Sequence, residues 1–189
     1  MLKDSKSYRK EFDSIGSHDV PIDAYYGVQT IRAKENFPIT GYQLNPIFIK
    51  SLAYIKKAAA LTNAEIQLLS QTKAQAISQA CDEIINGEHL EQFIVDPIQG
   101  GAGTSMNMNI NEVLANRASE ILHGKLGDYQ TIHPNDHVNY GQSTNDVIPT
   151  AGKMTVIQLS KDLRQELTRL ASAFGDKAKE FDHIIKMGR

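Results

Sequence analysis

The chain has 189 residues, 41% of them hydrophobic and 22% charged, which is enough for one substantial core or for one domain with part of another. Its formal net charge of -2 gives no broad attraction to nucleic acid or to an acidic membrane surface. No apolar run approaches the length that spans a bilayer, and the first residues lack the apolar core of a signal peptide. Cys81 is the single cysteine, so no intrachain disulfide can form and a reducing, cytoplasmic location is expected.

Residues 8–42 predict short strands and turns, because prolines and glycines interrupt aromatic and β-branched residues and no helical period is sustained. A helix is predicted to start at Asn45-Pro46, where the asparagine can cap and the proline suits the first turn. Its mostly apolar face runs from Ile49 to Ala60. The Lys56-Lys57 pair within it is interpreted as a solvated helix face.

A second helix is predicted after an interruption at Asn63 or Ser70. Its apolar residues recur at helical spacing, and Asn86-Gly87 supplies a C-terminal stop. Cys81 lies among these apolar residues, which favours a buried thiol over a nucleophile. A short helix through Leu90 is then expected to end before Asp96-Pro97, since the residue before a proline is pushed out of the helical region.

Two more helices are predicted in the second half of the chain. Apolar residues from Ile110 to Leu122 recur at helical spacing until Gly124. The last helix carries an uninterrupted apolar stripe opposite a charged face, as in coiled coils and bundles. Too little chain remains for this stripe to pack on, so an intermolecular or missing partner helix is implied. The stripe consists of Val156, Leu159, Leu163, Leu167, Leu170 and Phe174.

Two polar, nearly charge-free stretches are the most informative part of the sequence. Residues 100–109 read GGAGTSMNMN, and residues 133–146 read HPNDHVNYGQSTND. Their hydroxyl and carboxamide groups bind anions by hydrogen bonds without titrating near neutral pH. Both stretches lead into helices, whose first backbone N–H groups can point at a bound carboxylate. The combination suggests a site for a small dicarboxylic acid.

Each stretch also has a purely structural explanation. The glycines match neither a Walker loop nor a dinucleotide fingerprint, and a glycine turn with a Ser/Thr cap is the commoner origin of such a run. Asn107, Asn109 and Asn111 favour function, because asparagine is a poor helix former and local conflicts are tolerated mostly at functional sites. Residues 133–136 are as compatible with an ordinary turn as with a functional site, and residues 143–146 are as compatible with a simple helix cap as with a functional site.

A metal site is the weaker interpretation of the histidines. His133 and His137 have the i, i+4 spacing of some zinc ligands, but the proline between them spoils a simple helical face. No cysteine, glutamate or further histidine completes a ligand set. We therefore expect neither a metal nor another cofactor.

Several segments resemble the aspartase/fumarase superfamily, and together they cover nearly the whole chain. They are residues 25–30, 100–109, 111–118, 133–139 and 142–146. Within the superfamily they are most similar to aspartate ammonia-lyases, since fumarases usually carry Ser-Gly-Thr in place of Ala102-Gly103-Thr104 and Ser-Ser-Asn-Asp in place of residues 143–146. Gly141 departs from the serine often found there, which leaves the anion-binding groups intact.

The resemblance implies a mainly α-helical fold with short N-terminal strands and turns. Residues 1–146 would form the N-terminal lyase domain. Residues 147–189 would form the truncated first long helix of a central helical bundle. The family's enzymes are homotetramers whose active sites combine three subunits, so a homo-oligomer is implied, with no nucleic-acid or membrane partner.

The resemblance also implies the reversible deamination of L-aspartate to fumarate and ammonia through an aci-carboxylate intermediate. Thr104, Ser143 and Thr144 would hold the β-carboxylate of the substrate. Asn145, with Thr104, would hold its amine. A secondary dicarboxylate site or entrance would be lined by His133, Asn135 and Asp136.

The family's other catalytic groups are absent from this sequence. These are the proton-abstracting serine on a Gly-Ser-Ser loop, the lysine and asparagine that grip the α-carboxylate, and a Thr-His-Leu-Gln-Asp segment. We therefore expect an N-terminal fragment that is inactive alone. Two alternatives remain open: a fragment of a class II-type fumarase, and a short non-enzymatic protein that binds dicarboxylates and self-associates through its leucine stripe.

Overall fold

The computed structural model describes residues 7–188. Residues 1–6, on which the expectation about a signal peptide rests, and residue 189 lie outside this part. The described elements are strands β1 (Tyr8–Phe12) and β2 (Ser17–Pro21), helices α1 (Val28–Asn36), α2 (Pro46–Glu65), α3 (Gln71–Asn86), α4 (Thr104–Ile121) and α5 (Thr144–Glu180), a 3-10 turn η1 (Leu90–Gln92) and a π-helical turn η2 (Pro134–Val138).

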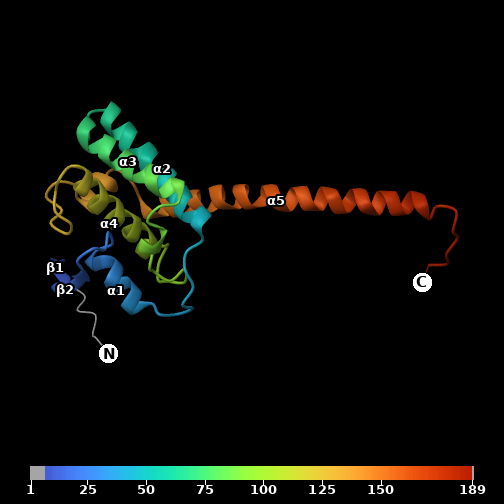
Figure 1. The fold of residues 1–189 in the computed structure, drawn as a ribbon, viewed down its shortest axis with the longest axis horizontal. Coiled ribbons are helices and arrows are strands. Elements are labelled where there is room, and N and C mark those ends of the chain that lie inside the picture. The colour runs from blue at the N-terminus through green and yellow to red at the C-terminus, as the bar shows by residue number, and fades with distance from the viewer. Residues whose placement is uncertain (1–6, 189) are drawn as a thin grey trace.

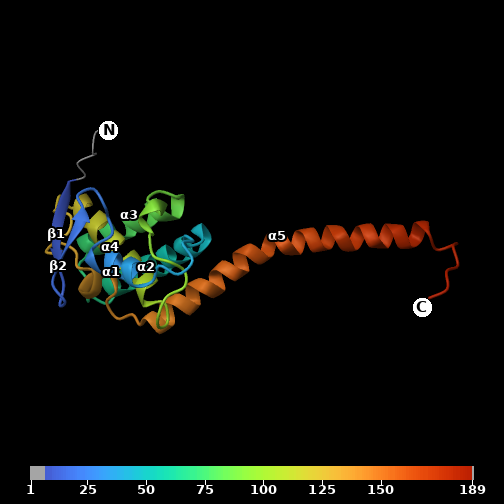
Figure 2. The same ribbon diagram turned by 90° about the horizontal axis from the view of Figure 1, so that it is seen from below.

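Helices α1 to α4 and the β1-β2 hairpin form one body, and α5 leaves it as a long rod (Figures 1 and 2). The two strands pair antiparallel, with Tyr8 opposite Pro21 and Phe12 opposite Ser17. Helix α4 contacts α1, α2, α3 and α5, so it is the central helix of the body. The expectation of a mainly helical fold with short N-terminal strands is confirmed.

The boundaries of α2 and α3 follow the signals in the sequence. The Oδ1 atom of Asn45 accepts a hydrogen bond from the backbone N–H of Ile47 at 2.8 Å, which caps α2. Ser70 caps α3, and Gly87 ends it with φ of 101°, a conformation that glycine adopts without strain. Cys81 is fully buried between these helices, as expected, and burial raises the pKa of its thiol.

The sequence prediction for residues 28–36 is wrong, because they form helix α1 and not strands and turns. The residue before this helix, Gly27, has no side chain to cap it. The carboxylate of Glu112 on α4 caps it instead. The backbone N–H groups of Gly27, Gln29 and Thr30 donate to the Glu112 carboxylate at 2.9, 3.0 and 3.0 Å. A cap supplied from more than 80 residues away leaves no trace in the local pattern.

Helix α5 packs on the body only through its first three turns. Val147, Ala151 and Thr155 are buried, whereas every residue described beyond Thr155 is exposed. The predicted apolar stripe therefore exists, and Leu163 on it is 60% exposed. The expected boundary between residues 146 and 147 falls in the first turn of α5, and the division into two domains remains a prediction. Within residues 7–188 no helix has the length and apolarity that a membrane crossing needs.

Replacing Glu112 by Gln should lower the free energy of unfolding by about 2 kcal/mol or more, because an amide group would face backbone donors that now share one carboxylate. Urea denaturation followed by circular dichroism measures this. Glu65→Gln, at an exposed position near the end of α2, should stay within about 0.5 kcal/mol of the parent chain. Equal stability of the two variants would contradict the capping role of Glu112.

The 189-residue chain should self-associate, because burying the stripe on α5 is favourable at about 25 cal/mol per Å². Sedimentation velocity should show species larger than the monomer. Replacing Leu163 and Leu167 by Gln should shift the chain toward monomer without changing its helical content. A clean monomer of the unmodified chain at high concentration would contradict the prediction.

Candidate functional site

The starts of α4 and α5 lie against each other. Gly103 precedes α4 with φ of 87°, and a Cβ atom at this position would come within 2.9 Å of the Ile148 side chain in α5. Glycine is therefore required here both by its backbone conformation and by the close approach of the two helices. The two polar stretches of the sequence thus meet in space. Their helix N-termini together present backbone N–H groups and a favourable electrostatic field for an anion.

A hydrogen bond joins the two helix starts. The Nδ2 atom of Asn107 on α4 donates to Thr144 Oγ1 on α5 at 3.1 Å. The same Nδ2 atom donates to Asn139 Oδ1 at 3.1 Å. Asn107 is 2% exposed, so this amide lies beneath the surface at which a ligand would bind.

The four residues expected to bind substrate lie at these two helix starts. Thr104 is the first residue of α4 and is exposed, as are Ser143 and Asn145, whereas Thr144 is partly buried. Ser143 Oγ accepts a hydrogen bond from the backbone N–H of Asn145 at 3.2 Å, so Ser143 is also the cap of α5. A capping hydroxyl oxygen still has its proton to donate, so the structural and the binding interpretations of Ser143 are compatible.

The interpretation of Lys56 as part of a solvated helix face is wrong. Lys56 has 0% exposure, and its Nζ atom donates to Asn139 Oδ1 at 2.8 Å and to Gln142 Oε1 at 3.0 Å. Lys57 behaves as expected: it is part-exposed and pairs with Asp82 on α3 at 2.6 Å. The helical period already placed Lys56 on the apolar face of α2, and this signal in the sequence could have predicted its burial.

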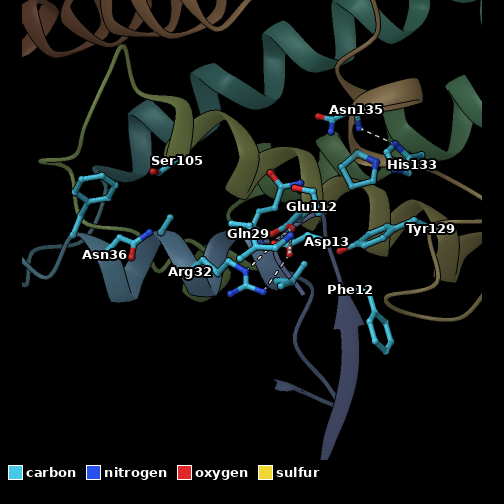
Figure 3. A pocket seen from close by; sticks show the side chains of 16 residues that line it. Phe12, Asp13, Gln29, Arg32, Asn36, Ser105, Glu112, Tyr129, His133 and Asn135 are labelled. Carbon is cyan, nitrogen blue, oxygen red and sulfur yellow. Dashed lines mark hydrogen bonds and ion pairs between the residues drawn. The ribbon is translucent and has the colours of Figure 1, made fainter. Parts of the chain in front are cut away.

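His133 and Asn135 line a cavity of about 430 Å³ beside this site (Figure 3). Ser105, the residue after Thr104, lines it from the start of α4, so the cavity and the helix starts are neighbours. Arg32 reaches it from α1, but its guanidinium is paired with Asp13 at 2.8 Å. Arg32 was not predicted as a site residue because helix α1, on which it lies, was not predicted.

The turn η2 fixes the orientation of the His133 ring. His133 Nδ1 accepts hydrogen bonds from the backbone N–H groups of Asn135 and Asp136 at 3.2 and 3.1 Å, so the ring caps its own turn. Asp136 is exposed on this turn. His137 Nδ1 accepts the N–H of His133 at 2.7 Å. Within residues 7–188 no group of three or more His, Cys, Asp or Glu side chains is arranged to hold a metal ion.

This arrangement suits a small anion that must be held without a fixed counter-charge. The hydroxyl and amide groups at the helix starts donate hydrogen bonds at any pH near neutrality. Donors of this kind also stabilise negative charge that develops during a reaction, provided that they are held in place beforehand. The paired helix N-termini and the buried amide of Asn107 supply that rigidity.

Comparisons with known proteins show the family to which the chain belongs. Residues 16–189 match the protein family described as "Lyase". The chain belongs to this lyase family. It is 54% identical over 189 residues to the aspartate ammonia-lyase of Bacillus subtilis (strain 168), which covers 100% of the chain and 40% of that enzyme. It is 52% identical over 186 residues to the class II fumarate hydratase of Halobacterium salinarum, which covers 98% of the chain and 39% of that enzyme.

A solved structure shows the same fold. The crystal structure titled fumarate lyase:delta crystallin from Brucella melitensis, in native form, superposes with a TM-score of 0.90 at 52% sequence identity. The match covers 97% of this chain and 43% of that one. The resemblance to the aspartase/fumarase superfamily and the fold that it implied are therefore confirmed. The chain spans about 40% of the length of the curated relatives named above.

The burial of Lys56 should make stability depend on pH. Burial lowers the pKa of Lys56 to about 7, against the weaker opposing effect of the nearby Cys81 thiol. In the unfolded chain a lysine titrates near pH 10.4. Between these two values the unfolded chain binds a proton that the folded chain has released, so stability rises with pH, by at most about 1.4 kcal/mol per pH unit.

Lys56→Met should remove this dependence. The difference in free energy of unfolding between the parent chain and the variant, measured by urea denaturation, should shift in favour of the parent as the pH rises from 7 to 9. The comparison cancels groups that titrate in both proteins. Parallel curves over this range would show that Lys56 keeps its proton in the folded chain.

Proposed function

We propose that this chain is the N-terminal portion of an aspartate ammonia-lyase, which converts L-aspartate reversibly to fumarate and ammonia. The observation that carries the proposal is the meeting of two helix starts at Gly103 and Ile148, with hydroxyl and amide groups on both sides. Membership of the lyase family and 54% identity to an aspartate ammonia-lyase support it.

The proposed reaction places its main demand on groups of this kind. Removal of a proton next to a carboxylate leaves that carboxylate with two negative charges in the aci-carboxylate intermediate. Thr104, Ser143 and Thr144 would donate hydrogen bonds to the β-carboxylate, where this charge develops, and Asn145 with Thr104 would hold the amine. Donors fixed in advance at such a position contribute about 3–4 kcal/mol each in other enzymes.

A secondary role is proposed for the cavity beside the site. His133 and Asn135 line it, and Asp136 lies on the same turn, so these residues would receive a dicarboxylate on its way in or hold a second one. Ser105 follows Thr104 at the start of α4 and also lines the cavity, so the cavity adjoins the proposed site.

The remaining parts of the active site are proposed to come from other segments and from other subunits. The base and the groups that would grip the α-carboxylate are not in this sequence. The exposed stripe on α5 would pack in a homotetrameric helical bundle, and residues 147–189 would belong to that domain. The 189-residue chain alone would then bind substrate weakly and not turn it over. A cytoplasmic location is proposed for the enzyme.

The second candidate is a class II fumarase, and one observation favours it. The chain is 52% identical to a class II fumarate hydratase, almost the same value as for the aspartate ammonia-lyase. Ala102 and Thr144, at positions where fumarases usually carry serine, favour the aspartase in our proposal.

The complete reading frame that encodes this chain provides the test. Its product should form fumarate from L-aspartate, followed by the ultraviolet absorbance of fumarate, and should not hydrate fumarate to malate. Activity on malate alone would identify a fumarase. A reading frame that stops at Arg189, together with submillimolar fumarate binding by calorimetry, would favour the non-enzymatic dicarboxylate-binding protein.

Thr144→Val in the active protein should lower kcat/KM by about 100-fold to 1,000-fold, as the loss of one donor to a developing charge does elsewhere. The fold should be intact by circular dichroism. Thr150→Val, an exposed position further along α5, serves as the matched control and should change the rate by less than about twofold. A Thr144→Val enzyme with the parent's rate would remove Thr144 from the site.

A further inference from the structure

We propose that Lys56 is a positioning residue for the site at the starts of α4 and α5. By fixing the direction of a chain of buried amide hydrogen bonds, it turns the Thr144 hydroxyl proton toward a bound carboxylate. The inference rests on the proposed function, because it takes a carboxylate to be the ligand of Thr144.

The surroundings of Lys56 are unusual for a lysine. The side chain is fully buried in the middle of α2, and both hydrogen-bond partners of its Nζ atom are amide oxygens, on Asn139 and Gln142. No carboxylate among residues 7–188 lies within ion-pair distance of it. Burial of an amine without a counter-ion is unfavourable, and an apolar side chain of the same length would fill the space without that cost. A role beyond packing is therefore required to explain the lysine.

Lys56 sets which way the hydrogen bonds around it donate. Its amine has at least two N–H groups, whether it is charged or neutral, and these donate to the oxygens of Asn139 and Gln142. Asn139 and Gln142 must therefore turn their oxygens toward Lys56 and their nitrogens away. Their nitrogens are indeed engaged elsewhere: Asn139 Nδ2 donates to the Gln142 carbonyl at 3.2 Å, and Gln142 Nε2 donates to the Val138 carbonyl at 2.8 Å.

The direction continues from Asn139 to Thr144. Asn139 Oδ1 accepts a second hydrogen bond, from Asn107 Nδ2, which obliges Asn107 to present its nitrogen to this side of the network. The other N–H of Asn107 donates to Thr144 Oγ1 at 3.1 Å. Asn107 Oδ1 is buried and has no hydrogen-bond partner among the described residues, so the nitrogen alone orients this amide.

The consequence for Thr144 is chemical. A hydroxyl group has one proton to donate and lone pairs to accept with. Since Asn107 already donates to the oxygen, the proton of Thr144 is free to point out of the network, toward the helix starts where the ligand would lie. If the network ran the other way, Thr144 would donate to Asn107 and present only lone pairs to a carboxylate, which repel it.

Two isosteric substitutions in the product of the complete reading frame test this direction. Asn107→Asp replaces the donating nitrogen by an oxygen, so the Thr144 proton would be drawn inward, and kcat/KM should fall by about 100-fold. Asn139→Asp keeps the oxygen that accepts from Lys56 and Asn107, and the loss should be at least about tenfold smaller. Equal losses, or a larger loss for Asn139→Asp, would overturn the proposal.

A double-mutant cycle tests whether Lys56 acts through Thr144. Lys56→Met should lower kcat/KM by about 100-fold in the parent enzyme and by less than about threefold in the Thr144→Val enzyme, because the hydroxyl that it orients is already gone. Lys57→Met, on the same helix and paired with Asp82, should leave the rate unchanged. If the losses from Lys56→Met and Thr144→Val multiply, the two residues act independently, and the proposal is overturned.

The side-chain amide of Asn107 provides a readout that needs no substrate. In ¹⁵N NMR spectra its two N–H protons should exchange slowly with solvent, and Lys56→Met should shift and expose them, while Lys57→Met should not. If the parent protein acts on neither aspartate nor malate, the proposed function fails, and this measurement still decides what Lys56 orients. If the parent is active and Lys56→Met leaves the Asn107 resonances unchanged, the proposal for Lys56 is wrong while the proposed function stands.

Discussion

The structure depends on the buried polar side chains of one helix, α4. Asn107, Asn109, Glu112 and Asn116 are each at most 2% exposed, and each hydrogen-bonds a segment distant in the chain. Apolar contacts hold helices together without direction, whereas buried hydrogen bonds are specific and costly to leave unmade. The buried polar side chains of α4 therefore decide where the irregular segments lie, with Asn107 on one side of the helix and the other three on the opposite side. Asn107 bonds Asn139 and Thr144, and Asn109 bonds the backbone of Gln92 and Ile94. Glu112 bonds residues 27–30, and Asn116 bonds the backbone of Tyr25 and Gly127.

The same helix also builds the candidate site. Its first residue, Thr104, is one of the proposed ligand-binding groups, and Asn107 one turn later reaches Thr144 at the start of α5. A site made from the starts of two packed helices is held more rigidly than one made from loops, which favours donors that are in place before charge develops. Lys56 would also fix the direction in which individual hydrogen bonds donate, and its amine lies fully buried beneath the site.

Features of the fold with local causes were predictable from the sequence. The start of α2 and both ends of α3 were found because Asn45, Ser70 and Gly87 act on their own helices. The alternative interruption at Asn63 was wrong, because α2 continues to Glu65. The exposed stripe on α5 was found because its apolar residues recur at a regular helical period. Helix α1 and the burial of Lys56 were missed, because the groups that stabilise them, Glu112 for the first and residues 139–142 for the second, lie more than 80 residues away in the chain.

The asparagines of α4 illustrate the limit of reasoning from local conflicts. The alternation of Asn107, Asn109 and Asn111 pointed to function, yet Asn109 holds the backbone at residues 92 and 94, and its role is structural. Only Asn107 reaches the candidate site. A poor helix former inside a helix thus marks a buried polar contact, and the three-dimensional structure is needed to show whether that contact serves the fold or a ligand.

The most direct test of this account is a crystal structure of the complete protein with succinate, a dicarboxylate that can undergo neither deamination nor hydration. The account predicts one carboxylate at the paired helix starts, within hydrogen-bond distance of Thr144 Oγ1 and of the first backbone N–H groups of α4. Succinate bound only in the cavity lined by Arg32 and His133, or nowhere on this chain, would contradict it.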